Sequence, residues 1–210
     1  MSSNVVELNH PLVDHHLAAL RGTGTSSADF RRHTSALATL LLAEATRSLP
    51  LKPVSVTTPL ETIEARRLAG RIAAVPILRA GLGMVDPLID LIPDIEIWHL
   101  GLYRDEETAR PVRYYDKLPA DDPTDTAFVV DPMLATGGSA ALAIETLQNW
   151  GVSQIMMLSI IAAPEGIDRL TERFPNVPLY TCAIDRELND QKFILPGLGD
   201  AGDRIFNTQR

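Results

Sequence analysis

Segments that are apolar on both faces alternate along this chain with segments of helical periodicity. The clearest apolar segment is Gln154–Ala162 (QIMMLSIIA), in which almost all side chains on both faces of the expected strand are apolar. By the same pattern we expect further strands at 54–58, 71–78, 95–102, 125–130 and 179–184. Strands buried on both faces occur in parallel sheets that helices cover on both sides. The sequence therefore predicts an α/β fold, with a mainly parallel sheet flanked by helices.

Apolar residues at helical spacing fill the intervals between these strands. They predict helices at 26–49, at 81–91, at 139–150 and from Pro164 onward, with a further helical segment near the N-terminus. The tail from Lys192 onward is rich in glycine and lacks periodicity. We therefore expect this tail to form a loop or hood over the functional site and to stay outside the core.

Length and composition narrow the function. The 210 residues suit one domain, which we place at 1–210 with its core at about 50–190. The net charge of −8 argues against a general nucleic-acid partner, and no apolar stretch reaches the roughly 20 residues that span a bilayer. The first residues do not resemble a secretory signal, and Cys182 is the single cysteine. We expect a cytoplasmic protein that has no disulfide and no membrane partner. We expect it to bind small-molecule ligands.

The segment at 128–139, FVVDPMLATGGS, carries the sharpest functional pattern. An expected strand ends at Asp131, a short loop follows, and residues 136–139 (TGGS) lead into an expected helix. Glycines let the main chain approach an anion closely, and the N–H groups at a helix N-terminus present partial positive charge. The hydroxyls of Thr136 and Ser139 add further donors. This pattern indicates a phosphate cradle at the carboxyl end of a strand, where open α/β sheets bind their ligands.

Asp131 stands directly before this loop, and a carboxylate there suits the two vicinal hydroxyls of a ribose. The segment lacks the Gly-Lys-Ser/Thr of a P-loop and the Gly-x-Gly-x-x-Gly of a dinucleotide site. On these residues alone, an ordinary strand–turn–helix junction with a Gly-Gly turn stays open as the alternative.

Four segments together resemble the uracil phosphoribosyltransferases, a family of type I phosphoribosyltransferases. They are DPMLATGGS at 131–139, PILRAGLGMV at 76–85, GLYRDEETARPVRYYDKLP at 101–119 and FILPGLGDAGDR at 193–204. The N-terminal HPLVDHHLAALR at 10–21 and FRR at 30–32 also fit. The wider family more often has two adjacent acidic residues in its loop, whereas Pro132 follows Asp131 here, as in the uracil enzymes. The resemblance covers almost the whole chain. It implies the type I phosphoribosyltransferase fold, with a C-terminal hood at 191–210 over the site.

The resemblance implies that the chain binds 5-phospho-α-D-ribose 1-diphosphate (PRPP) and uracil. It assigns PRPP contacts to Arg79, Arg104, Asp131, Pro132, Met133, Leu134, Ala135, Thr136, Gly137, Gly138, Ser139 and Asp200. It assigns uracil contacts to Ile194, Gly199, Asp200 and Ala201, where a main-chain strip would read the donors and acceptors of the base. Arg104, Asp131 and Asp200 are the expected catalytic residues. Phe193 stands where the family more often has tyrosine, which puts a role for that phenol hydroxyl in doubt.

The implied reaction is that of a pentosyltransferase of pyrimidine salvage, in which uracil and PRPP give UMP and diphosphate. The resemblance further implies Mg²⁺ as cofactor, held mainly by PRPP with Asp200 as the one suggested protein ligand. It also implies a homodimer or larger homo-oligomer and, as in some members, GTP as an allosteric activator. Two alternatives stay open: a phosphoribosyltransferase for another base, such as a purine or orotate, and an RNA-binding regulator that senses UMP on the same scaffold.

Overall fold

A six-stranded sheet forms the centre of the structure, a computed structural model that describes residues 4–104, 111–115, 118–119 and 121–208. Its strands are β1 (Val5–Glu7), β4 (Ile72–Pro76), β5 (Glu96–Ile97), β8 (Thr126–Leu134), β9 (Gln154–Ala162) and β10 (Leu179–Ile184). They lie in the order β1–β10–β9–β8–β4–β5, and every neighbouring pair is parallel. The predicted α/β fold class is therefore confirmed.

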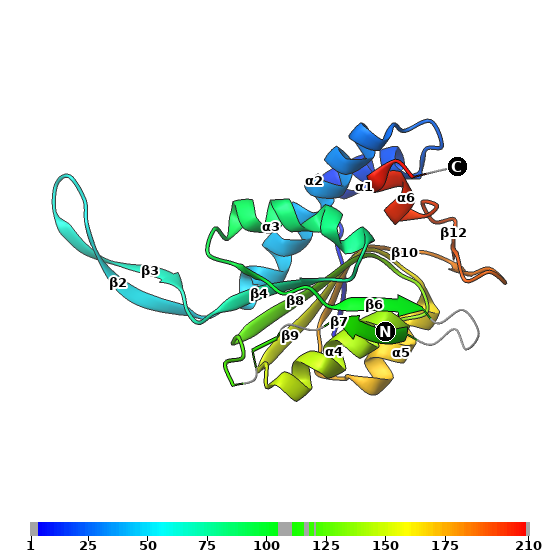
Figure 1. The fold of residues 1–210 in the computed structure, drawn as a ribbon. Coiled ribbons are helices and arrows are strands. Elements are labelled where there is room, and N and C mark those ends of the chain that lie inside the picture. The colour runs from blue at the N-terminus through cyan, green and yellow to red at the C-terminus, as the bar shows by residue number, and fades with distance from the viewer. Residues whose placement is uncertain (1–3, 105–110, 116–117, 120, 209–210) are drawn as a thin grey trace.

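Helices cover both faces of this sheet (Figure 1). One layer consists of α1 (Pro11–Arg21), α2 (Ser27–Ala45), α3 (Val85–Leu91) and α6 (Ala201–Phe206), and the other of α4 (Gly138–Trp150) and α5 (Pro164–Arg173). Phe128 of β8 is fully buried in the core beneath the first layer, whereas its neighbour Val129 is fully buried in the core beneath the second. Successive strand residues point to opposite faces, so a strand between two cores needs an apolar side chain at every position.

The predicted helices are present with small shifts at their ends. The one predicted at 26–49 is α2 followed by a 3-10 turn at Thr46–Ser48, and the Ser26 side chain caps it by accepting a hydrogen bond from the Asp29 N–H. The one predicted at 81–91 is a 3-10 turn at Ala80–Met84 that leads into α3. Gly151 ends α4 with a φ of 102°, a left-handed conformation that glycine adopts readily. None of the helices in the described ranges has the length and apolar character needed to cross a membrane.

The prediction of a single strand at 95–102 is wrong. β5 pairs with β4 over two residues only, and the Trp98 N–H then donates to the Ala74 carbonyl. The next bond of this parallel ladder would come from the N–H of residue 76, which is proline and has none. The ladder is interrupted here and continues only as an isolated parallel bridge between Ile77 and Leu100. After this bridge, β6 (Gly101–Arg104) pairs with antiparallel β7 (Pro111–Tyr115) in a separate two-stranded sheet.

An antiparallel hairpin projects from the body of the molecule (Figure 1). It consists of β2 (Leu51–Thr57), which contains most of the predicted strand at 54–58, and β3 (Thr62–Leu68), which the apolar pattern did not predict. β3 reads TIEARRL and is largely exposed, so it lacks the apolar continuity of the central strands.

The expectation that the tail stays outside the core is also wrong. Its short ribbon of β11 (Glu187–Leu188) and β12 (Ile194–Leu195) leads into α6. Ile194, Leu198, Ala201 and Ile205 are buried in the same core as α2. A helix of six residues is too short to show helical periodicity in the sequence. The glycines just before it made the whole segment resemble a loop.

Candidate active site

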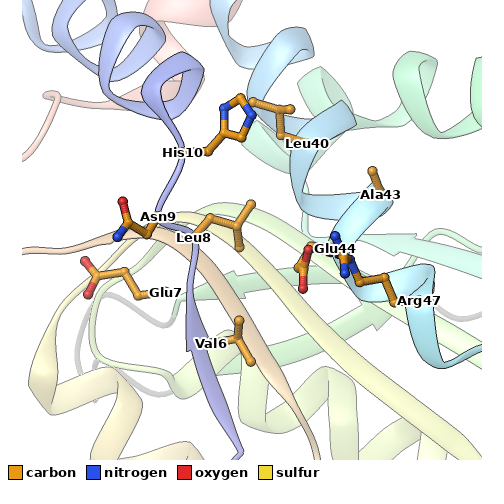
Figure 2. Close-up of a pocket in the computed structure, with 9 residues that line it drawn as sticks. All are labelled: Val6, Glu7, Leu8, Asn9, His10, Leu40, Ala43, Glu44 and Arg47. Atoms are coloured by element: carbon orange, nitrogen blue, oxygen red, sulfur yellow. Dashed lines mark ion pairs between the residues drawn. The ribbon is translucent and has the colours of Figure 1, made fainter.

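One pocket brings together three of the segments that the sequence singles out. It has a volume of about 240 Å³ and is lined by Ile77, Leu78, Arg79, Ala80, Asp131, Met133, Ser139, Asp200 and Gly202. These residues come from the end of β4 and the turn after it, from β8 and the start of α4, and from the beginning of α6. A pocket of about 400 Å³ between α2 and the segment formed by β1 and the residues after it contains none of the predicted site residues (Figure 2).

β8 continues through Asp131 as far as Leu134, so the predicted end of this strand at Asp131 is wrong. β8 remains paired with β9 to its last residue, whereas β4 on its other side ends opposite Val130. Pro132 has no N–H to donate and lies where β8 has only one neighbour in the sheet. Asp131 is therefore held inside a strand, at the point where the sheet opens toward the pocket.

The turn from β8 into α4 depends on two glycines. Gly137 has a φ of 72°, and a Cβ built on it would lie 3.0 Å from the Gly166 carbonyl oxygen. A Cβ on Gly166 of α5 would lie 2.4 Å from the Ala135 oxygen, so α5 packs directly on the main chain of the loop. No side chain caps the N-terminus of α4, which leaves its first N–H groups free to bind an anion. Gly166 was not among the predicted residues, because only the contact between the two backbones reveals its role.

Asp131 and Asp200 give the pocket two carboxylates. Burial, with a smaller contribution from the negative charge of Asp200, raises the pKa of Asp131 to about 7. The Met133 N–H donates to Asp131 Oδ1 over 3.3 Å and lowers the pKa of Asp131 in part. A hydroxyl donor or a cation bound beside the two carboxylates would relieve their repulsion.

The donor set of the pocket suits a cation that takes few ligands from the protein. Within the described ranges, no group of three or more histidine, cysteine, aspartate or glutamate side chains could hold a metal ion. Mg²⁺ commonly takes one or two carboxylates from the protein and its other ligands from water and substrate phosphates. Asp131 and Asp200 fit that role.

Arg79 links the loop after β4 to the tail. Its Nη2 lies 3.1 Å from Asp203 Oδ1, and hydrogen bonds from Thr208 and Arg79 lower the pKa of Asp203. Asp200 Oδ1 accepts the Asp203 N–H over 2.9 Å and so caps the N-terminus of α6. A Cβ on Gly81 would lie 2.5 Å from the Val130 oxygen, so the loop after β4 also lies against β8.

The remaining predicted site residues lie outside the lining of this pocket. They are Pro132, Leu134, Ala135, Thr136, Gly137 and Gly138 of the loop and Ile194, Gly199 and Ala201 of the tail. The main chain of Arg104 ends β6, but the Arg104 side chain and residues 105–110 lie outside the part of the chain that the structure describes. Phe193 is 45% exposed; its N–H donates to Asn189 Oδ1 over 2.9 Å, and its carbonyl accepts the Asn189 N–H over 2.9 Å.

Two arginines that the sequence did not single out for the site connect α1 with the tail. The buried Arg204 of α6 donates to the Leu198 carbonyl over 2.7 Å, to the Gly22 carbonyl over 2.6 Å and also to the Leu20 carbonyl. Arg21 of α1 donates to the Gly197 carbonyl over 2.8 Å and pairs with Asp185. Arg204 falls in the segment at 193–204, and Arg21 ends the N-terminal HPLVDHHLAALR at 10–21, which also resembles the family. Nothing in the sequence distinguished Asp185.

Known proteins match this chain over nearly its full length. The family model described as uracil phosphoribosyltransferase matches residues 6–208. A uracil phosphoribosyltransferase of Roseiflexus castenholzii is 54% identical over 199 residues, which cover 95% of this chain and 96% of that protein. One of Agathobacter rectalis is 52% identical over 206 residues, which cover 98% of this chain and 99% of that protein.

Solved structures show the same fold. A protein of Aquifex aeolicus superposes with a TM-score of 0.91 at 35% identity, covering 96% of this chain and 97% of its own. A hypoxanthine-guanine phosphoribosyltransferase of Bacillus anthracis superposes with a TM-score of 0.52 at 12% identity, covering 76% of this chain and 80% of its own, and shares the fold alone. With the family model and the curated relatives, these matches show that the chain belongs to the uracil phosphoribosyltransferase family.

Proposed function

We propose that this chain transfers the phosphoribosyl group of PRPP to uracil and releases UMP and diphosphate. The observation that carries the proposal is the pocket shared by the Arg79 loop, Asp131 of β8 and Asp200 of the tail, in a chain of this family. Residues 1–210 act as one domain, whose core also includes buried residues of α1, α2 and the tail outside the predicted range of about 50–190. The tail at 191–210 completes the site.

PRPP binds across the carboxyl ends of β4 and β8. Its 5′-phosphate lies at residues 136–139, where the uncapped N-terminus of α4 and the hydroxyls of Thr136 and Ser139 donate hydrogen bonds. Asp131 accepts hydrogen bonds from the ribose hydroxyls, and the main chain at 132–135 shapes the floor of this subsite. Arg79 and Arg104 contact the diphosphate, for which a planar guanidinium is well suited.

Uracil binds against the main chain of the tail, at Ile194, Gly199, Asp200 and Ala201. A main-chain strip offers N–H and C=O groups in a set order, so a base with the wrong pattern leaves buried polar groups unpaired. Phe193 is 45% exposed, and its N–H and carbonyl are both hydrogen-bonded to Asn189, so no uracil contact is assigned to it.

In the reaction, N1 of uracil forms a bond to C1′ of PRPP, and the bond from C1′ to the diphosphate oxygen breaks with its electron pair on the leaving group. Arg79 and Arg104 stabilise the charge on the diphosphate, and Asp131 holds the ribose in position. Mg²⁺, when bound with PRPP through Asp200 or Asp131, supplies further positive charge beside the diphosphate. The N1 proton passes to solvent or to a substrate oxygen, and no side chain is assigned to it.

The test is a turnover assay with purified protein, PRPP, MgCl₂ and radiolabelled uracil, read out as labelled UMP. Cytosine, orotate and hypoxanthine serve as competing bases in parallel reactions. We expect UMP from uracil and at most trace product from the other bases. Absence of UMP from folded protein, or faster turnover of a purine or orotate, would refute the proposal. The homo-oligomeric state, activation by GTP and the cytoplasmic location stay predictions.

A further inference from the structure

An ion pair holds both sides of a single residue in the tail. The Gly197 N–H donates to Asp185 Oδ2 over 3.0 Å, and the Gly197 carbonyl accepts a hydrogen bond from Arg21 Nη1 over 2.8 Å. Arg21 and Asp185 also bind each other in a two-point contact, with Nη1–Oδ2 and Nη2–Oδ1 distances of 2.9 and 2.6 Å. These four hydrogen bonds fix the direction of both polar groups of Gly197.

Asp185 and Arg21 both belong to parts of the fold outside the tail, the central sheet and α1. Asp185 follows β10 directly, and its N–H donates to the Ala162 carbonyl at the end of β9, over 2.8 Å. Its side chain is only 4% exposed, and that of Arg21, at the end of α1, is 26% exposed. The position of Gly197 is therefore set by the central sheet and by α1 together.

Gly197 lies between the two parts of the tail to which the proposed function assigns uracil. Ile194 stands three residues before it, and Gly199, Asp200 and Ala201 follow it closely. A Cβ on Gly197 would lie 2.1 Å from the Ile194 oxygen, so the chain turns tightly back on Ile194 at this point. Any rotation of the Gly197 peptide groups would move one of these parts relative to the other.

We propose that Arg21 and Asp185 are positioning residues for the base, and that they orient the main-chain strip that reads uracil. Gly197 and Gly199 both have positive φ angles, 66° and 77°, and glycine has more main-chain freedom than any other residue. Without the ion pair, uracil would have to order this main-chain strip as it binds. The conformational entropy lost in that ordering would weaken uracil binding. Neither residue lines the PRPP pocket. Asp200, which does, is held separately as the N-cap of α6 by the Asp203 N–H, so PRPP binding changes little. This inference rests on the proposed function.

The first test is steady-state kinetics with uracil and PRPP varied separately. Asp185→Asn removes the charge but keeps the size, and Arg21→Lys keeps the charge but removes the planar fork that reaches both Asp185 and Gly197. For both variants we expect the KM for uracil to rise about tenfold or more, with kcat and the KM for PRPP within about twofold of wild type. Arg173→Gln is the matched control, since it breaks a surface ion pair with Glu145 and leaves the tail untouched.

The second readout is hydrogen–deuterium exchange of the free protein, followed in peptides that contain residues 194–201. Faster exchange there in both variants, with unchanged exchange in the β8–α4 loop, supports a positioning role and does not require turnover. An unchanged KM for uracil, a parallel rise in both KM values, or faster exchange across the whole protein would overturn the inference. If Asp185→Asn does not fold, Arg21→Lys decides by the same criteria. Absence of UMP formation by the wild type refutes the proposed function instead, and the two failures are thus distinguishable.

Discussion

Replacing Asp131 with asparagine should stabilise the free protein at about pH 8 and change its stability little at about pH 4. Asparagine has nearly the same shape as aspartate, and its Oδ1 can still accept the Met133 N–H. Asparagine carries no charge, so it avoids the cost of burying a negative charge and the repulsion from Asp200. These are the two effects that raise the pKa of Asp131 to about 7. The variant therefore isolates the cost of keeping an ionised carboxylate in this pocket.

The sign of the effect follows from the raised pKa. The ordinary value is 3.8, so between about pH 4 and pH 7 the folded protein keeps a proton that the unfolded chain has released. Stability therefore falls as the pH rises through this window, and the loss is complete above pH 7. A shift of about three pH units at about 1.4 kcal/mol per unit gives at most about 4 kcal/mol at pH 8.

Urea unfolding of wild type and Asp131→Asn at half-unit steps from about pH 4 to pH 8 measures the stability that ionisation of Asp131 costs. The difference between the two proteins cancels the titration of all other groups that the substitution does not affect. We expect the free-energy difference to grow in favour of the variant by about 1 kcal/mol per pH unit and to level off above pH 7. A difference that is independent of pH, or a variant less stable than wild type at pH 8, would show that the pocket does not disfavour the Asp131 carboxylate.

Three further substitutions test the loop, the tail and the diphosphate contact. Gly137→Ala forces a side chain into the left-handed region against the Gly166 oxygen, so we expect a loss of about 1–2 kcal/mol in urea unfolding and a higher KM for PRPP. Arg204→Ala leaves the carbonyls of Leu198, Leu20 and Gly22 without their donor, and thermal unfolding should show a loss of about 3 kcal/mol or more. Arg104→Gln should lower kcat/KM for PRPP by about 10- to 100-fold in steady-state assays and leave the unfolding midpoint unchanged.

The strands that were predicted best are those with helices on both sides. β9 and β10 have the predicted bounds, because most of their positions are buried against one of the two cores and carry apolar side chains. The pattern fails where pairing depends on a partner elsewhere in the chain. The edge strand β1 has only three residues, β3 belongs to an exposed hairpin, and the apolar run at 95–102 is divided because Pro76 interrupts the ladder.

The site was predictable where a local pattern carries the chemistry. The loop at 131–139 combines a strand, glycines and a helix start within a few residues, and the pocket lies beside it. Gly166, Arg21 and Asp185 could not be predicted in this way, because their roles come from contacts with residues distant in the sequence. Gly166 acts by having no side chain, and the buried pair by binding main-chain atoms, so neither leaves a motif.

The two carboxylates of the pocket have a consequence for substrate binding. A diphosphate would be repelled by ionised Asp131 and Asp200, yet the proposed contact of Asp131 with the ribose hydroxyls is strongest when Asp131 is charged. With a pKa of about 7, Asp131 is close to half protonated at neutral pH in the free protein. Binding of PRPP as its magnesium complex should favour the charged form and release about half a proton at pH 7.

Isothermal titration calorimetry in buffers of different ionisation enthalpy measures this proton release directly. The phosphates of PRPP contribute protons of their own, but they do so equally in wild type and in Asp131→Asn. The difference between the two proteins therefore isolates Asp131, and we expect it to fall toward zero at about pH 8.5, where Asp131 is already ionised before PRPP binds. Equal proton counts at pH 7 would mean that PRPP binds without changing the charge of Asp131, and would refute the expectation that bound PRPP favours the ionised carboxylate.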